Sequence, residues 1–292
     1  MDRRLFIKTL VASAAASQGF AKANDSSPTA AQIDAMEQKH LEIMSRYQSF
    51  LEGEKLTIGM LVYPGMFLMD LMGPLTVFEA MLNRDIHLVW KDLKPVNQKP
   101  TGSTSVSIPI TPTTTFKDCP KKLDVLFVPG GVPGTFNLMR DTEVISFLHE
   151  QGTSARFVTS VCTGSLVLGA AGLLNGYKAT THWATMEGLA PLGAKPTNQR
   201  VVIDRNRVTG GGVTSGLDFG LTLAGLLRSP AYAEAIQLYL EYDPKPPFNA
   251  GTPRTAPKSV LGFVSDMFGN TGDVAKTAAT EARLNYASYF KQ

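Results

Sequence analysis

The feature that most constrains the fold is a series of short apolar runs that alternate with segments of helical periodicity. The clearest runs cover residues 56–63, 123–128 and 155–161, and each ends at glycine, proline or small polar residues. Continuous apolar runs of this length are typical of strands that are buried on both faces of a parallel sheet. Helical patterns follow the runs, at about 71–82, 142–151, 215–227 and 232–240, and Gly73-Pro74 should interrupt the first of these helices near its start. The alternation predicts an α/β fold with a doubly wound, mostly parallel sheet and helices on both faces.

Other segments predict additions to this sheet. Residues 103–110 alternate in the manner of an antiparallel insertion strand, and residues 201–204 and 207–209 flank a turn and predict a hairpin. An amphipathic helix is expected over 29–51, within a linker region of 24–55, and it would pack on the core or, less favoured, bind a partner. The main domain should cover 56–242. A tail of residues 243–292 is rich in proline and glycine and becomes weakly helical from about 259.

The first 23 residues predict an export signal. Arg3-Arg4-Leu5-Phe6-Ile7-Lys8 matches the twin-arginine pattern, and Ala21-Lys22-Ala23 supplies a small-residue cleavage site. An ordinary Sec signal or an uncleaved terminus is the alternative. We therefore expect the twin-arginine translocase as a partner and a periplasmic protein that starts near Asn24. The apolar stretch is too short and too rich in alanine for a membrane anchor, so no membrane association is expected of the mature form.

Most of the net charge belongs to this leader. The chain has a formal net charge of +3, and residues 1–23 hold four basic side chains against one acidic side chain. The remainder is therefore close to neutral. It contains no basic helix and no basic run interleaved with aromatic residues, so nucleic-acid binding is not expected.

Cys162 lies where the third apolar run turns into a helix. A thiol in such an elbow faces the unpaired N–H groups of the helix, which can lower its pKa and make it a nucleophile. The alternative is a small buried hydrophobic residue. With Cys119 as the only other cysteine there is no disulfide framework, although sequence alone leaves a single pairing of the two open.

The turns after the other buried strands carry polar or flexible residues. Asp70 lies in an apolar setting that should favour its neutral, proton-donating form, or it caps a helix. Gly130 and Gly131 form a turn whose backbone N–H groups could stabilise an anion, or simply a tight turn. His182 is a candidate base or a structural hydrogen-bonding residue. The histidines show no ligand spacing, so no metal site is expected.

Several blocks in order resemble the ThiJ/PfpI family of the class I glutamine-amidotransferase-like superfamily. They are Tyr63-Pro64-Gly65, Asp70-Leu71-Met72-Gly73-Pro74, Val128-Pro129-Gly130-Gly131, Thr159-Ser160-Val161-Cys162-Thr163-Gly164, Thr180-Thr181-His182-Trp183 and Gly211-Gly212-Val213-Thr214-Ser215-Gly216-Leu217-Asp218. The resemblance implies a flavodoxin-like fold, usually dimeric, that acts without a cofactor. It implies Cys162 as nucleophile, Asp70 as acid and Thr163 as an assisting hydroxyl group. Gly130, Gly131, His182 and Trp183 would then bind the substrate or its developing charge.

Within this family the blocks are most similar to the branch that hydrates isonitriles, and residues 246–251 match its tail as well. Thr163 stands where the protease-like branch has histidine, which weakens a peptidase interpretation. The resemblance thus implies cysteine-dependent hydration of a small isonitrile to an N-substituted formamide through a thioimidate. Two alternatives stay open. One is a non-catalytic periplasmic ligand-binding or redox-sensing protein, and the other is a different cysteine-dependent hydrolase or amidase.

Overall fold

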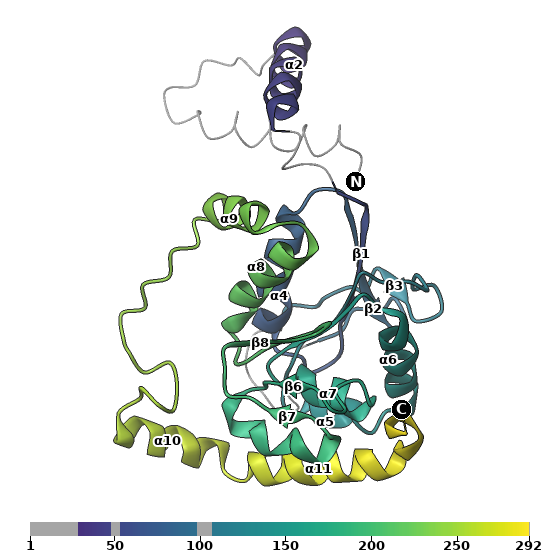
Figure 1. The fold of residues 1–292 in the computed structure, drawn as a ribbon, viewed down its shortest axis with the longest axis vertical. Helices are drawn as coiled ribbons and strands as arrows, with labels where there is room; N and C mark the ends of the chain where they lie inside the picture. Colours follow the sequence, from purple (N-terminus) through teal and green to yellow (C-terminus); the bar gives the residue numbers. More distant parts are fainter. Residues whose placement is uncertain (1–28, 48–52, 98–106, 292) are drawn as a thin grey trace. The chain divides into compact units, whose positions relative to one another are not determined.

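The computed structural model describes residues 29–47, 53–97 and 107–291, and these residues fall into two compact units (Figure 1). One unit contains helix α2 (Ala30–Arg46) together with residues 53–55 and 82–85. The helix predicted over 29–51 is therefore present as far as Arg46, and residues 48–51 lie outside the described part. Its packing on the main domain stays a prediction, as does the export signal, because residues 1–28 also lie outside the described part.

The second unit is built on a seven-stranded sheet in the order β3-β2-β1-β4-β5-β9-β8. The strands of this sheet are β1 (Leu56–Leu61), β2 (Arg84–Trp90), β3 (Thr114–Thr115), β4 (Val125–Val128), β5 (Phe157–Val161), β8 (Val201–Asp204) and β9 (Arg207–Gly210). Strand β1 pairs parallel with β4, β4 with β5, and β5 with β9, whereas β8 and β9 form the predicted antiparallel hairpin. A second sheet joins β6 (Lys178–Ala179) and β7 (Lys195–Pro196). The mostly parallel, flavodoxin-like fold predicted from the sequence is confirmed.

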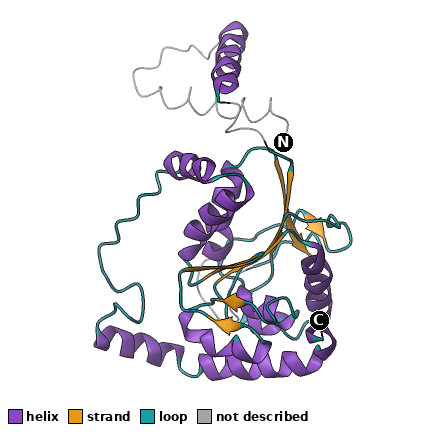
Figure 2. Ribbon diagram, viewed as in Figure 1, coloured by secondary structure: helices purple, strands orange, loops and turns teal. Residues whose placement is uncertain are grey.

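Helices cover both faces of this sheet (Figure 2). Helices α4 (Leu68–Ala80) and α8 (Ser215–Leu227) pack against each other on one face, next to α9 (Pro230–Tyr239). The other face carries α5 (Gly134–Leu138), α6 (Thr142–Ser154) and α7 (Gly164–Ala170), and α11 (Thr271–Asn285) packs outside α7. None of the helices in the described part of the chain is long and apolar enough to cross a membrane.

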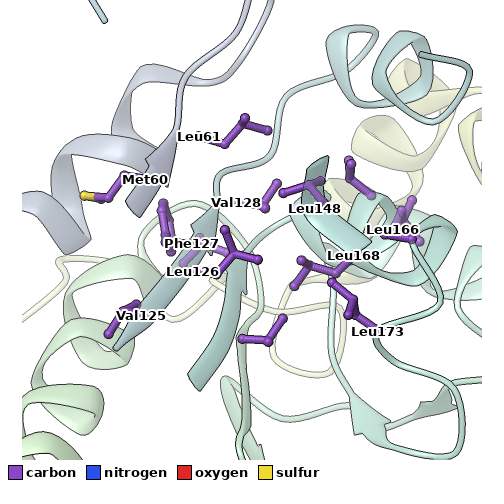
Figure 3. Packing of buried hydrophobic residues seen from close by; sticks show 14 of the residues in the cluster. Met60, Leu61, Val125, Leu126, Phe127, Val128, Leu148, Leu166, Leu168 and Leu173 are labelled. Carbon is purple, nitrogen blue, oxygen red and sulfur yellow. The ribbon is translucent and has the colours of Figure 1, made fainter. Parts of the chain in front are cut away.

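The core lies between the sheet and its two helical layers (Figure 3). All four residues of β4 are buried, because a central parallel strand is covered on both faces. Leu148 of α6 and Leu166 and Leu168 of α7 are fully buried in the same cluster. The continuous apolar runs of the sequence thus occupy the centre of the sheet, and this arrangement brings the ends of β1, β4 and β5 to one edge.

Two local expectations are wrong. The antiparallel strand predicted over 103–110 is reduced, within its described residues, to a single bridge between Ile110 and Val96, while 103–106 lie outside the described part. The break expected at Gly73-Pro74 does not occur, since α4 continues through Pro74. Gly216 of α8 lies against Pro74, where an added Cβ would be 2.9 Å from Pro74 Cδ. Close packing of the two helices outweighs the local cost of proline.

The tail forms more regular structure than its composition suggests. After an exposed segment (residues 241–257), the chain forms α10 (Lys258–Phe268), α11 and a short 3-10 helix, η3 (Ala287–Phe290). One side of α11 is buried through small side chains, namely Ala275, Ala278, Ala279 and Ala282. These alanines pack on the segment that contains two further 3-10 helices, η1 (Trp183–Gly188) and η2 (Ala190–Leu192). The tail is therefore part of the folded unit and reaches the neighbourhood of Trp183.

Candidate active site

Cys162 forms the predicted elbow between β5 and α7. Its φ of 55° lies in the left-handed region, which a residue other than glycine adopts at a cost of about 1–3 kcal/mol. The backbone N–H of Cys162 donates to the carbonyl groups of Gly210 (3.1 Å) and Gly211 (2.7 Å), so the turn is fixed against the end of β9. The residue is only 6% exposed. A strained, anchored turn of this kind is typical of a nucleophile at the carboxyl edge of a parallel sheet.

Asp70 lies in the first turn of α4, but it does not cap that helix. The residue at the cap position is Phe67, whose side chain makes no capping hydrogen bond. The Asp70 side chain is fully buried, and its Oδ2 accepts a hydrogen bond from the backbone N–H of Gly130 at 3.0 Å. No N–H or O–H group of the described residues donates to Oδ1. The capping alternative is therefore wrong, and the carboxyl group reaches across to the turn after β4.

The Cys162 thiol and the Asp70 carboxyl group form a coupled pair. Burial raises the pKa of Asp70 from 3.8 to about 7, although hydrogen bonds from Cys162 and Gly130 act in the opposite direction. Burial, followed by the charge of Asp70, raises the pKa of Cys162 well above its ordinary value, and the N–H and hydroxyl groups of Thr163 offset only part of this rise. The expectation of a thiolate stabilised by the helix is thus wrong for the resting site. Because the two groups interact, their protonation equilibria are coupled and they titrate as a pair.

Thr163 follows the nucleophile and holds its hydroxyl group inside the site. The side chain is buried, its Oγ1 accepts a hydrogen bond from Gly131 N at 2.9 Å, and Thr135 Oγ1 lies 2.7 Å away. The backbone N–H and the hydroxyl group of Thr163 both act to lower the pKa of the Cys162 thiol. The structure thus brings Cys162, Asp70 and Thr163 together, as the sequence predicted.

The turn at Gly130 and Gly131 has a structural role and not the anion-binding role that was expected. The two backbone N–H groups donate to Asp70 and Thr163, so they are not available to a substrate. A Cβ at Gly130 would lie 2.5 Å from Thr163 N and 2.8 Å from Asp70 Oδ2. Glycine is therefore required because the backbone passes between the acid and the hydroxyl group. The expectation that this turn forms an anion-binding site gives way to a structural role, in which it holds the two side chains in place.

The sequence and the fold are similar to those of known proteins. Residues 57–225, more than half of the chain, match the model of the DJ-1/PfpI family. The chain belongs to the DJ-1/PfpI family. It is 52% identical over 206 residues to the isonitrile hydratase of Pseudomonas putida, which corresponds to 70% of this chain and 87% of that enzyme.

Two further relatives show how much of each chain the DJ-1/PfpI similarity covers. A ThiJ/PfpI family protein from Pseudomonas syringae superposes with a TM-score of 0.74 at 48% identity, covering 78% of this chain and 92% of that one. An HTH-type transcriptional regulator of Pseudomonas aeruginosa is 35% identical over 142 residues, but this chain spans only 38% of its length. The likeness to the isonitrile hydratase extends over most of that enzyme, which supports an enzymatic role.

His182 and Trp183 follow a residue that is anchored to the Cys162 elbow, and their side chains belong to an aromatic cluster. Thr181, one residue earlier, donates from its hydroxyl group to the Cys162 carbonyl at 3.0 Å. The ring centroids of His182 and Trp183 lie 5.2 and 5.3 Å from that of Phe268, at the end of α10. Burial lowers the pKa of His182, and its Nδ1 accepts from Ala184 N at 3.3 Å. No hydrogen bond within the described residues joins His182 to Cys162 or Asp70. The geometry therefore favours a structural role for a neutral His182 over the role of a catalytic base.

Two residues of this site, Thr135 and Phe268, carry no clear sequence signal. Thr135 and Tyr63 form hydrogen bonds behind Thr163, and Phe268 comes from beyond the family segment.

Cys119 and Cys162 are both buried and free, and burial raises the pKa of Cys119 to about 11. No group of three or more His, Cys, Asp or Glu side chains in the described part of the chain could hold a metal ion.

Proposed function

We propose that this protein hydrates an isonitrile to the corresponding N-substituted formamide, with Cys162 as the nucleophile. The observation that carries the proposal is the buried pair of Cys162 and Asp70, whose carboxyl group has a pKa raised to about 7. A carboxyl group with this pKa can take up and release a proton near neutrality, which is what acid–base catalysis requires. The likeness to the isonitrile hydratase of Pseudomonas putida supports the choice of substrate class.

In the first step the terminal carbon of the isonitrile receives both a proton and the sulfur. Asp70, in its protonated form, donates its proton to the lone pair of that carbon while the Cys162 sulfur adds to the same atom. The S–H proton passes to the Asp70 carboxylate, with which the thiol interacts. One π bond of the isonitrile breaks, one C–H and one S–C bond form, and no group leaves. The product is a thioimidate on Cys162.

In the second step water adds to the thioimidate carbon. Asp70, which is protonated at the end of the first step, donates its proton to the nitrogen and takes one from the water in exchange, so that a neutral tetrahedral intermediate results. Its hydroxyl proton then returns to Asp70 as the C–S bond breaks, and the departing sulfur recovers a proton from the acid. The formamide leaves with the oxygen of water, and both residues regain their starting protonation.

The occupied glycine N–H groups favour hydration over amide or ester hydrolysis. Hydrolysis by a cysteine enzyme passes through an oxyanion, which needs free hydrogen-bond donors. Here Gly130 and Gly131 already donate to Asp70 and Thr163. Addition to an isonitrile needs a proton at carbon, and the Asp70 side chain is the group that can supply it. The interactions at the glycine turn therefore fit this reaction better than that of a hydrolase or amidase.

Burial also limits the form of the substrate. Because Cys162 is only 6% exposed, the reacting end must be small, and a linear isonitrile group meets this requirement. Phe67 is 52% exposed, and its backbone N–H donates to the Gly130 carbonyl at 2.8 Å, next to the site. Together with Trp183 it offers apolar surface, so we propose an apolar substituent on the isonitrile nitrogen.

Formamide production from a panel of isonitriles by the purified chain tests the function. Cys162→Ser should abolish turnover, because an alcohol of much higher pKa replaces the thiol. Cys119→Ser is the matched control, since Cys119 is an equally buried free thiol placed before β4, and it should keep turnover largely intact. Retained binding of isonitriles without formamide production by the unaltered chain would instead favour a ligand-binding or redox-sensing protein.

A further inference from the structure

The turn between β9 and α8 anchors the backbone of the nucleophile. The Cys162 N–H donates to the Gly211 carbonyl at 2.7 Å, and Gly211 is the first residue of this turn. Thr214 is its last residue, directly before α8. Because Cys162 has a positive φ, a hydrogen bond from this turn helps to hold a backbone conformation that is unfavourable by itself. Residues that fix the turn therefore affect the elbow.

Arg200, the residue before β8, holds both ends of this turn. Its backbone carbonyl accepts a hydrogen bond from the Gly211 N–H at 2.8 Å. Its guanidinium group donates from Nη2 to the Thr214 carbonyl at 2.9 Å. The main chain of Arg200 thus fixes the start of the turn, and its side chain fixes the end. A substitution of the side chain leaves the first contact in place and removes the second.

Asp218 and Tyr242 keep the guanidinium group in this position. Asp218 Oδ2 accepts from Arg200 Nε at 2.8 Å and from Nη2 at 2.6 Å, and it also accepts from Tyr242 Oη at 2.9 Å. The planar fork of arginine suits such simultaneous contacts with a carboxylate and a carbonyl group. Asp218 lies in the first turn of α8, whereas Tyr242 lies beyond the family segment of 57–225. The contacts of Arg200 therefore connect the hairpin, α8 and the start of the tail.

We propose that Arg200 is a positioning residue that keeps the turn of residues 211–214 closed on the Cys162 elbow. Arg200 does not touch the reacting atoms; it acts through the Gly211 carbonyl, which holds the Cys162 N–H. Without the guanidinium group the end of the turn can open, and the elbow loses part of its anchor. This inference rests on the proposed function for its catalytic consequence, but its effect on access to the thiol is independent of the substrate.

The contacts of the Arg200 side chain act on local opening more than on overall stability. The side chains of Arg200 and Asp218 are 52% and 33% exposed, and ion pairs with this exposure contribute little to the free energy of global unfolding. Opening of a single turn costs less free energy than global unfolding, so the loss of a few exposed hydrogen bonds changes the open population measurably. A variant of Arg200 should therefore remain folded.

Alkylation of the two cysteines by iodoacetamide at pH 8, followed by peptide mass spectrometry, measures this opening. Arg200→Gln removes the charge and the fork of the guanidinium group. Cys162 should react about tenfold faster in this variant, because the turn that anchors it opens more often. Cys119 is the reference within the same chain, since both thiols are free and 6% exposed. Cys119 lies before β4, away from this turn, and its rate should not change.

Arg140→Gln is the matched control. Arg140 Nη2 lies 2.9 Å from Glu281 Oε2, and these side chains are 54% and 48% exposed, but this pair connects the segment between α5 and α6 with α11. The control variant should alkylate both cysteines at the rates of the unaltered chain. Tyr242→Phe removes only one of the hydrogen bonds to Asp218 and should raise the rate of Cys162 less than Arg200→Gln does.

The inference is overturned if Arg200→Gln leaves the alkylation of Cys162 unchanged, or if the rates of Cys162 and Cys119 rise equally, which would mean general loosening of the fold. An equal effect of Arg140→Gln would overturn it as well. If Arg200→Gln does not fold, Asp218→Asn takes its place under the same criteria, because it removes the charge that holds the guanidinium group.

Formamide production, measured in parallel, separates this inference from the proposed function. Arg200→Gln should lower kcat about tenfold and leave KM nearly unchanged, because the nucleophile is less well placed while the apolar contacts of the substrate remain. Faster alkylation of Cys162 in Arg200→Gln, together with no formamide from the unaltered chain, would reject the proposed reaction and keep the role of Arg200. Formamide production with unchanged alkylation would do the reverse.

Discussion

At the scale of single residues, Asp70 links stability and chemistry because its buried carboxyl group is easier to protonate in the folded chain than in the unfolded one. Its pKa rises from 3.8 to about 7, with burial as the main cause. The folded chain therefore binds an extra proton between these two pH values. By linkage, the stabilisation from this group is complete below pH 3.8 and is lost as the pH rises through about 7.

Replacing Asp70 by asparagine separates these two effects. Asp70→Asn keeps an oxygen for the Gly130 N–H but has no ionisable proton, so turnover should fall by about 10²–10⁴-fold. The difference between 3.8 and about 7 corresponds to about 4 kcal/mol. The unfolding free energy of the variant should therefore improve relative to the unaltered chain by up to about this amount between pH 4 and pH 8. Urea unfolding at both pH values measures it, and a constant difference would mean that Asp70 is not protonated near neutrality.

At the scale of elements, the sequence predicts the unit of β5, Cys162 and α7, because a buried strand followed at once by a helix is a local pattern. It does not predict the chemistry of the elbow, since burial by distant residues outweighs the local effect of the helix N–H groups on the thiol. Thr135 and Thr163 are 28 residues apart and meet only when α5 and α7 pack. Likewise, the donors of Gly130 and Gly131 are used by partners on other elements, which no turn motif reveals.

Helix α10 offers a prediction at the same scale. Phe268 at its end contacts His182 and Trp183, whereas Phe263 on the same helix is 66% exposed. If this cluster bounds the site, Phe268→Ala should raise KM for isonitriles with apolar substituents several-fold and leave kcat nearly unchanged, because apolar contact area is lost without a change at Cys162. Phe263→Ala is the matched control and should leave both constants unchanged. Equal effects of the two variants, or a fall in kcat alone for Phe268→Ala, would contradict this placement.

At the scale of the whole molecule, the family domain of residues 57–225 accounts for the sheet and for Cys162, Asp70 and Thr163. The sequence predicts this domain well, because long apolar runs and several ordered blocks lie within it. The packing of the tail is not predictable in the same way. Helix α11 packs through alanines, and small side chains of this kind give a weak periodic signal. The remaining expectation at this scale is export, which rests on the leader alone.

We propose export by the twin-arginine route, supported by Arg3-Arg4 and the cleavage pattern at Ala21-Lys22-Ala23. The pair acts as a receptor-read address and not as a positive patch, so the double variant Arg3→Lys, Arg4→Lys keeps the charge but should block export. Fractionation of bacteria that express either form measures the periplasmic yield. Equal periplasmic recovery of the two forms would mean another export route, in which the chain crosses unfolded.

The central claim is that the Cys162 sulfur adds to the isonitrile carbon without loss of any group. Intact-protein and peptide mass spectrometry, after rapid mixing with an isonitrile and acid quenching, tests this most directly. The account predicts an adduct on the peptide that contains Cys162, heavier by the full mass of the isonitrile, which decays as formamide forms and does not form in Cys162→Ser. Turnover without such an adduct, or formamide production by Cys162→Ser, would contradict the account.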